Sequence, residues 1–550
     1  MVLEKIQKEN DIKKLTPEEL ELLKDEIRQF LIESISVTGG HLASNLGVVE
    51  LTMALHLCFD LPKDKIVWDV GHQSYTHKIL TGRKDGFSSL RQYGGMSGFP
   101  KADESDCDCF NTGHSSTSIS AGLGLATARQ VTGDDYHVVS VIGDGALTGG
   151  MAYEALNNAS SVKGNFIIVL NDNNMSISEN VGGISQYLSG FRTADAYRDF
   201  KNNVMNSLNH IPIYGERMVK HIRNTKSSIK QLFIPGMFFE EMGIIYLGPV
   251  DGSDIKEMCR VFDEAKRVDG PVLVHVLTKK GSGYDPAERY PSRFHGAEPF
   301  VIETGLPKNK RTKANYTDVF STVMKKLGER NPKVVAITAA MADGTGLRRF
   351  HRNFPDRFFD VGIAEAHATT FAAGLAKAGL IPVFAVYSSF LQRAFDQILH
   401  DVCIQNLHVI FAIDRAGLVG SDGETHQGVF DLSFLLEIPN LTVMSPKNRW
   451  EMADMVRFAV DFPYPVALRY PRGEAYEGLK EFRTPILYGK SEVICRESGI
   501  AILFIGHMSE LGESVWKAMK EAGYRCSLIN ARFAKPLDTE MIRDRSEERK

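Results

Sequence analysis

The chain of 550 residues carries 64 basic and 68 acidic side chains, which give a formal net charge of -4, and 43% of its residues are hydrophobic. This balance, without a long block of either sign, excludes a nucleic-acid-binding tail, and the length allows three or four domains of roughly 150 residues. Residues 1–15 lack the apolar core of a signal peptide, and no apolar run approaches the roughly 18 residues of a membrane span. We therefore expect a cytoplasmic, multidomain protein that acts on small molecules, with neither nucleic acid nor membrane as a partner.

The 7 cysteines are scattered, apart from Cys107 and Cys109. Paired Cys-x-x-Cys spacing, which is typical of a zinc site, does not occur in the sequence. We expect reduced thiols with a structural role.

Apolar runs rich in Val and Ile alternate with helical segments in the first part of the chain. Each run ends in Gly, Asp, Asn or Ser, which is the pattern of strands buried on both faces of a parallel sheet. The predicted strands are 66–70, 138–142, 166–170 and 272–277. A Lys-rich stretch, 306–313, then predicts the end of a first domain covering 1–310. Within it, 187–242 has no clear strand and is predicted to be a mobile segment with some helix.

Two further α/β domains are predicted after this boundary. In the second, covering 311–482, the predicted strands are 334–338, 383–387, 409–413, 441–444 and 466–468. The third, covering 483–550, has predicted strands at 500–505 and 526–529 with a helix at 509–521. Two strands and one helix would leave a parallel sheet poorly covered, so this domain is predicted to be incomplete. The fold class is therefore α/β, with three doubly wound domains and mostly parallel sheets.

Two predicted strands end in side chains that suit a metal-bound diphosphate. Strand 138–142 runs into Gly-Asp-Gly at 143–145, and strand 166–170 runs into Asn-Asp-Asn-Asn at 171–174. Glycines let the backbone approach phosphate oxygens, and oxygens at neighbouring strand ends can share a hard cation. Alone, Gly-Asp-Gly is equally well a tight turn between a strand and a helix. The spacing matches thiamine diphosphate enzymes, and the matching magnesium ligands are Asp144, Asn173 and the Met175 carbonyl.

A polar loop beginning at Asn111 leads into a helix predicted over 119–129. Unpaired N-H groups at that helix start, together with the loop hydroxyls, favour diphosphate oxygens. A plain serine N-cap explains the serines but not the Gly-His that precedes them. The predicted cofactor contacts in this loop and after the Gly-Asp turn are Gly113, His114, Ser115, Gly145 and Ala146.

Glu365 opens an alanine-rich helix after a strand that ends at 361. An acid in a first turn often only complements the helix dipole. In a thiamine diphosphate enzyme, however, a buried carboxyl hydrogen-bonded to the pyrimidine assists deprotonation of the thiazolium, because desolvation raises its pKa. After the next strand, Tyr387 or Phe390 belongs either to the core or to a ring stacked on the pyrimidine, and we favour Phe390.

The loop 414–430 carries Arg415, Asp422 and His426 among several glycines. It is either an exposed excursion or a collar around a substrate. With Arg469 and Arg472 it offers cations for a phosphate, although a structural ion pair is an equal alternative for any one arginine. Upstream, His41 and His72 lie in Gly- and Ser-rich segments and are candidates for proton transfer.

With these motifs in view, the chain resembles the 1-deoxy-D-xylulose 5-phosphate synthase family over nearly all its length. The resemblance depends on Gly-Gly-His-Leu-Ala-Ser-Asn-Leu-Gly (39–47), Gly-His-Gln-Ser-Tyr (71–75), Gly-His-Ser-Ser-Thr-Ser-Ile-Ser (113–120), the two strand-end motifs, Tyr-Ser-Ser-Phe-Leu-Gln-Arg (387–393), Asp-Arg-Ala-Gly (414–417) and Ser-Asp-Gly-Glu-Thr-His-Gln-Gly (421–428). It implies three α/β domains, a homodimer, and thiamine diphosphate with Mg2+ as cofactors. The implied reaction joins pyruvate to D-glyceraldehyde 3-phosphate with release of CO2. Members of this family continue past Lys550, which is a further reason to expect an incomplete third domain.

The resemblance also implies roles for individual residues. Glu365 would activate the aminopyrimidine, and His41 and His72 would assist around the thiazolium and the bound donor. Tyr284 would help to hold the cofactor, and His295 would lie near the site. The acceptor phosphate would be bound by Tyr387, Arg415 and Arg472. Asp422 and His426 would meet the acceptor hydroxyl and the nascent alkoxide.

Two alternatives stay open. A transketolase shares the cofactor layout and a similar Asp-Gly-x-Thr-His-Gln loop, although Asp-Arg-Ala-Gly and Tyr-Pro-Arg-Gly favour the synthase. A truncated relative that binds the cofactor without turnover is the other alternative. The presence of Glu365, Asp144 and Asn173 argues against it.

Overall fold

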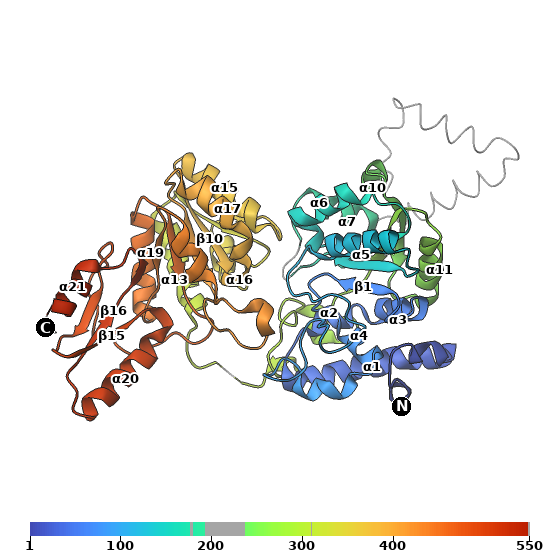
Figure 1. The fold of residues 1–550 in the computed structure, drawn as a ribbon, viewed down its shortest axis with the longest axis horizontal. Helices are drawn as coiled ribbons and strands as arrows, with labels where there is room; N and C mark the ends of the chain where they lie inside the picture. Colours follow the sequence, from blue (N-terminus) through green and yellow to red (C-terminus); the bar gives the residue numbers. More distant parts are fainter. Residues whose placement is uncertain (177–179, 193–236, 310, 548–550) are drawn as a thin grey trace, which may run out of the picture. The chain divides into compact units, whose positions relative to one another are not determined.

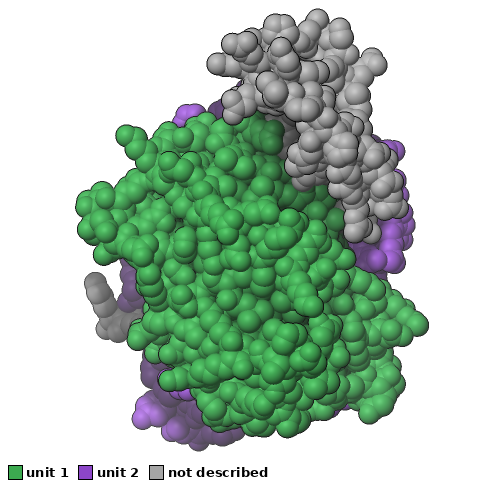
Figure 2. Space-filling view, turned by 90° about the vertical axis from the view of Figure 1, so that its right-hand side faces the viewer, with its two compact units in different colours: residues 1–90, 98–306 green, residues 91–97, 307–550 purple. Residues whose placement is uncertain are grey.

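The computed structural model describes residues 1–176, 180–192, 237–309 and 311–547. They form two compact units, one of residues 1–90 and 98–306 and the other of residues 91–97 and 307–550 (Figure 2). Most of the segment predicted to be mobile, residues 193–236, lies outside the described residues; its two ends, within α7 and α10, are helical. In the part of the chain that the structure describes, no helix has both the length and the apolar character needed to span a membrane.

The first unit is built on a sheet whose strand order is β1-β2-β3-β5-β4, with all pairs parallel. Helices α5, α6 and α7 lie on one side of this sheet and α1 to α4 on the other (Figure 1). Its main elements are α1 (Pro17–Thr38), α2 (Leu42–Leu46), α3 (Val49–Cys58), β1 (Lys65–Trp68), α4 (Tyr75–Leu80), α5 (Ser118–Thr132), β2 (Val138–Gly143), α6 (Gly150–Ala159), β3 (Phe166–Asp172), α7 (Gly183–Arg192), α10 (Met237–Glu241), β4 (Ile245–Asp251), α11 (Ile255–Lys266), β5 (Pro271–Leu277), α12 (Asp285–Arg289) and β6 (Phe300–Val301). A short strand, β7 (Leu306–Pro307), pairs with β6.

The second unit contains a larger sheet and a smaller one. The larger has the order β17-β12-β13-β11-β10-β8-β9 and is parallel except for β17, and the smaller has the order β14-β16-β15. The elements are α13 (Tyr316–Arg330), β8 (Val334–Thr338), α14 (Arg348–Asn353), β9 (Phe358–Asp360), α15 (Glu365–Lys377), β10 (Ile381–Tyr387), α16 (Ser388–Leu391), α17 (Phe395–Gln397), β11 (Ile410–Asp414), α18 (Asp431–Glu437), β12 (Thr442–Met444), α19 (Arg449–Asp461), β13 (Val466–Arg469), β14 (Glu492–Cys495), β15 (Ile500–Phe504), α20 (Ser509–Glu521), β16 (Cys526–Asn530), β17 (Phe533–Lys535) and α21 (Thr539–Glu547).

The two faces of the larger sheet carry different helices. Alternate residues of β8 and β10, such as Val334 and Val383, pack into a core cluster with α13, α14 and α19. Helix α15 packs on β8 and β10 without joining that cluster. Helices therefore cover both faces, which explains why the strands are apolar at consecutive positions.

The predicted α/β class with mostly parallel sheets is confirmed, and each predicted strand lies within two residues of an observed one. Strand β4 was missed because Gly248 and Pro249 interrupt its apolar run. It lies at the edge of its sheet, where a proline is tolerated. The last part of the chain also holds β14, β17 and α21 in addition to the expected two strands and one helix, and β17 pairs with β12 of the larger sheet. The division at 310 and 482 into three domains stays a prediction.

Candidate active site

The ends of strands β2 and β3 lie side by side, as the motifs predicted. Gly143 is opposite Asn171 in the parallel pair, and the Asp144 N-H donates to the Asn171 carbonyl at 3.1 Å. Beyond the strands, the Asn174 N-H donates to Asp144 Oδ2 at 2.6 Å, so the carboxylate is tied to the neighbouring turn. In that turn the Met175 N-H donates to Asn173 Oδ1 at 3.1 Å. The structure therefore brings the three predicted magnesium ligands to one edge of the sheet.

This donor set fits a hard cation. It consists of one carboxylate, one carboxamide and one backbone carbonyl, and Mg2+ is typically bound by one or two carboxylates together with phosphate oxygens and waters. Within the described ranges, no group of three or more His, Cys, Asp and Glu side chains is arranged to hold a metal. The Gly145 backbone leaves no space for a side chain, since a Cβ there would lie 2.8 Å from the Ser176 Cβ.

The loop before α5 is bound to the same edge. Ser116, with a left-handed φ of 68°, donates from its hydroxyl to the Ala146 carbonyl at 2.7 Å. Gly113, His114 and Ser115 precede it directly, so the loop predicted to contact the cofactor is anchored beside the Gly-Asp-Gly turn at Ser116. The hydroxyls of Thr112 and Ser118 are buried and have no hydrogen-bond partner among the described residues, which fits a polar group bound here.

One expectation about this loop needs correction. The buried Asp69 accepts hydrogen bonds from the N-H groups of Ser116, at 2.6 Å, and Ser118, at 3.0 Å. The first amide of α5, that of Ser118, and one amide of the loop before it are therefore already used, so fewer N-H groups are available to a diphosphate than the sequence suggested. Asp69 follows β1, and nothing in its local sequence marks it as the residue that orders the loop.

Three histidines gather in the first unit. The ring centroids of His41 and His72 are 5.6 Å apart, and those of His72 and His295 are 5.0 Å apart. The buried Asn45 positions the pair, because its amide donates to the carbonyls of His41, at 2.6 Å, and His72, at 2.7 Å. The Asn45 oxygen in turn accepts from the Tyr75 N-H at 2.7 Å. The sequence predicted the histidines but not Asn45 or Tyr75.

The sequence analysis missed Lys280, which contacts both the turn after β3 and one of the three histidines. Its ammonium donates to the Ser176 carbonyl and lies 3.3 Å from His295 Nδ1. Burial lowers its pKa to about 8, although the negative charge of Asp144 acts in the opposite direction. Four residues further along the chain, Tyr284 donates its hydroxyl to the Ile302 carbonyl at 2.6 Å and packs on Phe294. That internal hydrogen bond occupies the Tyr284 proton.

In the second unit, Glu365 begins α15 with 4% of its surface exposed. Burial raises the pKa of its carboxyl, and the Arg393 guanidinium at 3.9 Å lowers it by less. A buried acid with a raised pKa is suited to share a proton with a bound base. This environment is the one that the sequence analysis expected.

The two aromatic candidates lie together. The ring of Phe390 stacks on Tyr387, with centroids 5.7 Å apart, and meets the His426 ring edge-on at 5.4 Å. The guanidinium of Arg415 lies 3.6 Å from the centroid of the Tyr387 ring. Tyr387, Phe390, Arg415 and His426 therefore form one contiguous cluster.

The charges around this cluster are only partly balanced. Burial lowers the pKa of Arg415 to about 9, and repulsion by Arg472 adds to this. Burial raises the pKa of Asp422, but Arg91 and His426 lower it by more, so it lies below its usual value. Arg91, which sequence analysis did not single out, forms an ion pair with Asp422. Arg472 donates to the Val419 carbonyl at 3.4 Å.

Arg469 is not available to a substrate. Its Nε donates to Asp431 at 2.8 Å, and both side chains are buried. Arg469, one of the cations considered for the phosphate, therefore forms a structural ion pair instead.

Comparison with known proteins agrees with this geometry. The family model for 1-deoxy-D-xylulose-5-phosphate synthase matches residues 3–278, and the model for the pyrimidine binding domain of transketolase matches residues 312–477. The curated 1-deoxy-D-xylulose-5-phosphate synthase of Lachnoclostridium phytofermentans is 57% identical over 98% of this chain and 87% of its own length. The corresponding protein of Caldanaerobacter subterraneus subsp. tengcongensis is 54% identical over 98% of this chain and 87% of its own.

Among solved structures, a transketolase from Campylobacter jejuni covers 96% of this chain and 91% of its own, with 16% identity and a TM-score of 0.41. That likeness is too weak to carry an argument. The alignments to the two curated proteins cover 98% of the chain and therefore include both units. The chain belongs to the 1-deoxy-D-xylulose-5-phosphate synthase family.

Proposed function

We propose that the chain joins pyruvate to D-glyceraldehyde 3-phosphate, releasing CO2 and 1-deoxy-D-xylulose 5-phosphate. This reaction is the first step of the methylerythritol phosphate route to isoprenoids, and its product also feeds thiamine synthesis. The observation that carries the proposal is 57% identity over 98% of the chain to a curated protein named for this activity. The retained donor set at the ends of β2 and β3 supports it.

The cofactors in this proposal are thiamine diphosphate and Mg2+. The chemistry that thiamine diphosphate supplies when bound is an electron sink for the decarboxylation of pyruvate. Asp144, Asn173 and the Met175 carbonyl would hold the metal. Lys280, buried and 3.3 Å from His295, would place a positive charge near the diphosphate when protonated.

The proposed roles of the other residues follow from their surroundings. Glu365 holds a proton at a higher pH than an exposed carboxyl does, because it is buried, and can share it with a ring nitrogen. His41, His72 and His295 would transfer or hold protons near the donor, and the hydrogen bonds from Asn45 fix the first two. Phe390 would stack on the pyrimidine.

The acceptor phosphate is assigned in this proposal to Arg415 and Arg472, beside Tyr387. Arg415 is suited to the role because it is buried next to a second arginine, so an added dianion would relieve their repulsion. Asp422 and His426 would meet the acceptor hydroxyl. The proposal also includes a homodimer and a cytoplasmic location.

The test is CO2 release from labelled pyruvate by the purified chain, with Mg2+ and thiamine diphosphate, with and without D-glyceraldehyde 3-phosphate. We expect release that depends on both cofactors and a product that contains carbon from both substrates. Use of xylulose 5-phosphate in place of pyruvate as donor would instead identify a transketolase. Cofactor binding without turnover would identify a non-catalytic relative.

A further inference from the structure

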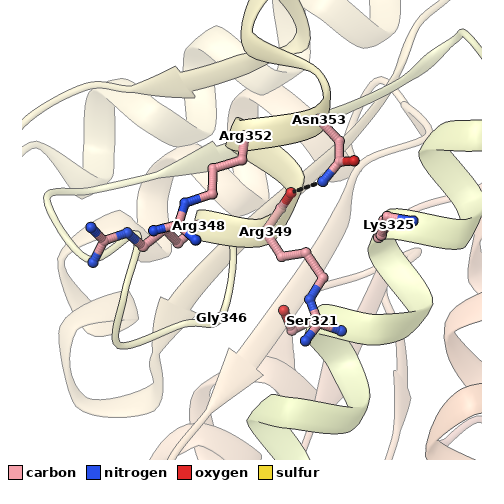
Figure 3. Close-up of a pocket in the computed structure, with 7 residues that line it drawn as sticks. All are labelled: Ser321, Lys325, Gly346, Arg348, Arg349, Arg352 and Asn353. Carbon is pink, nitrogen blue, oxygen red and sulfur yellow. Dashed lines mark hydrogen bonds between the residues drawn. The ribbon is translucent and has the colours of Figure 1, made fainter.

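The second unit has a basic pocket away from the residues discussed so far. It is an open hollow of about 560 Å³, lined by residues of α13, of α14 and of the loop before α14. Lys325 comes from α13, and Arg348, Arg349 and Arg352 come from one short stretch of α14. Figure 3 shows Arg349 extending from α14 toward Ser321 of α13. A hollow of this volume accommodates a small molecule.

The positive charge of this pocket is incompletely balanced. Arg348 pairs with Asp343 at 2.9 Å and Lys325 pairs with Glu329 at 2.6 Å. Arg349 donates only to the Thr322 hydroxyl, at 2.9 Å, and Arg352 has no ion pair or hydrogen bond among the described residues. Two guanidinium charges therefore stay without a counter-ion on one helix, where like charges three and four residues apart repel each other.

The two existing ion pairs would compete only weakly with a ligand for Arg348 and Lys325. The side chain of Arg348 is 56% exposed and that of Asp343 is 33% exposed, and pairs of this kind contribute little to stability. A ligand with several negative charges can meet up to four cations here, and guanidinium groups bind phosphate oxygens in a bidentate manner. The arrangement therefore favours a polyanion over a ligand with a single charge.

One loop connects the pocket to the cluster around Tyr387. This loop, residues 339–347, runs from β8 to α14 and contains Asp343, which pairs with Arg348, and Gly346, which lines the pocket. Between them, Gly344 packs on Tyr387 so closely that a Cβ would lie 2.0 Å from the Tyr387 hydroxyl. A shift of this loop toward Tyr387 would displace its ring from Arg415.

We propose that this pocket binds a small molecule bearing at least two phosphate groups, and that its binding weakens the acceptor site. The ligand takes Arg348 from Asp343, the released loop moves, and Gly344 displaces Tyr387 from Arg415. The acceptor part of this inference rests on the proposed function, whereas the binding part does not.

Binding is tested with inorganic pyrophosphate and the full chain, already saturated with Mg2+ and thiamine diphosphate. We expect one additional saturable site per chain, weaker binding of inorganic phosphate, and affinity that falls with added salt. The double substitution Arg349→Ser and Arg352→Ser should weaken pyrophosphate binding at least about tenfold, because it removes the two unpaired charges. The matched control, Arg457→Ser with Arg525→Ser, removes two arginines of the same unit outside the pocket and should bind like the wild type.

The effect of the pocket ligand on the acceptor site is measured by steady-state kinetics. Pyrophosphate should raise the KM for D-glyceraldehyde 3-phosphate in the wild type and in the control, with kcat nearly unchanged, and should have no such effect in the Arg349→Ser, Arg352→Ser variant. That variant, checked for native circular dichroism, should have wild-type kinetics without pyrophosphate. The charge-conserving Arg349→Lys, Arg352→Lys variant should keep part of the affinity.

Equal pyrophosphate affinity in the pocket variant and the wild type would overturn the binding site. An equal loss in the control variant would also overturn it. Binding in the pocket without a change in KM would overturn the coupling. A chain that releases no CO2 but binds pyrophosphate through Arg349 and Arg352 would refute the proposed function and leave the pocket standing.

Discussion

Two groups of buried charges in the second unit differ in how they are balanced. In the first group, which we call the junction network, Lys447, Glu451, Glu492 and Arg532 all meet a charge of opposite sign. Arg532 donates to Glu451 at 2.8 Å and to Glu492 at 2.9 Å. Burial raises the pKa of Glu492, but the hydrogen bond from Lys447 and other contacts lower it by more. The network joins α19 to β14 and to Arg532, which lies between β16 and β17.

The second group lies around the candidate site and has fewer partners. Burial raises the pKa of Asp414 to about 7 and lowers that of Arg415 to about 9. Glu365 is also shifted toward its neutral form. The charges of the junction network are thus paired within the chain, whereas Asp414, Arg415 and Glu365 have pKa values shifted toward neutrality, which suits a ligand or a proton transfer. Asp422 in the same region is the exception, because Arg91 pairs with it and its pKa lies below the usual value.

The largest effect expected from this comparison is at Glu365. Replacing it by alanine removes the buried acid and should lower the rate of product formation by about 10² to 10⁴, the range of positioned acid-base catalysis. Magnesium-dependent binding of thiamine diphosphate should be largely kept, as measured by quenching of protein fluorescence. Glu365→Gln, which keeps the shape but not the proton exchange, should lose a similar amount. A rate close to that of the wild type in either variant would remove the assigned role.

The next effect should be on folding, at the junction network. Arg532→Met leaves Glu451 and Glu492 without this partner in the interior and should destabilise the second unit by about 3 to 5 kcal/mol. Thermal unfolding followed by calorimetry measures the change. The control is Arg525→Met, where the arginine is exposed and the effect should be within about 0.5 kcal/mol. An equal loss of stability in Arg532→Met and Arg525→Met would contradict the structural role given to the junction network.

A smaller effect is expected in the pH dependence of stability. Because the pKa of Asp414 rises from its usual 3.8 to about 7 on folding, its contribution is full below about pH 4 and is lost as the pH rises through about 7. Asp414→Asn cannot ionise, so between pH 5 and 8 it should gain stability relative to the wild type by a few kcal/mol. The Thr317 hydroxyl, 2.7 Å from Asp414, can still donate to the amide oxygen. Asp461→Asn, on the surface, should follow the wild type, and a parallel profile for Asp414→Asn would contradict the assignment.

The smallest effect concerns Lys280 and extends the comparison to the first unit. With its pKa lowered to about 8, Lys280 is charged below that pH and increasingly neutral above it. Affinity for thiamine diphosphate should therefore fall as the pH rises from about 7 to 9. Lys280→Gln should bind the cofactor about tenfold more weakly at pH 7 and lose most of this pH dependence. Titration of the cofactor at several pH values measures both, with Lys279→Gln as the control because Lys279 is exposed.

The sequence predicted those parts of the molecule that local pattern determines. Strand β8 and helix α20 have the predicted bounds because one is an uninterrupted apolar run and the other has clear helical spacing. Strand β14 was missed because it begins with Glu492, a charged residue that is buried only because Lys447 and Arg532 meet it. A pattern of hydrophobicity cannot show such a partner.

The same limit applies to the candidate site. Asp144 and Glu365 could be found because each belongs to a short motif at the end of a strand or the start of a helix. Lys280 and Arg91 could not, since their positions depend on contacts with residues far away in the sequence. Arg91 is 331 positions from its partner Asp422. Lysine and arginine are usually exposed, so neither stood out from the surface.

The hydrogen bonds of Asn45 have a consequence for how this protein can change. One carboxamide, fully enclosed, fastens two separate stretches of backbone, each carrying an imidazole. Because both bonds end on main-chain oxygens, they set where the two side chains leave the backbone, whatever those side chains are. Either ring can therefore be replaced while the anchor stays, whereas losing the anchor would free both stretches at once.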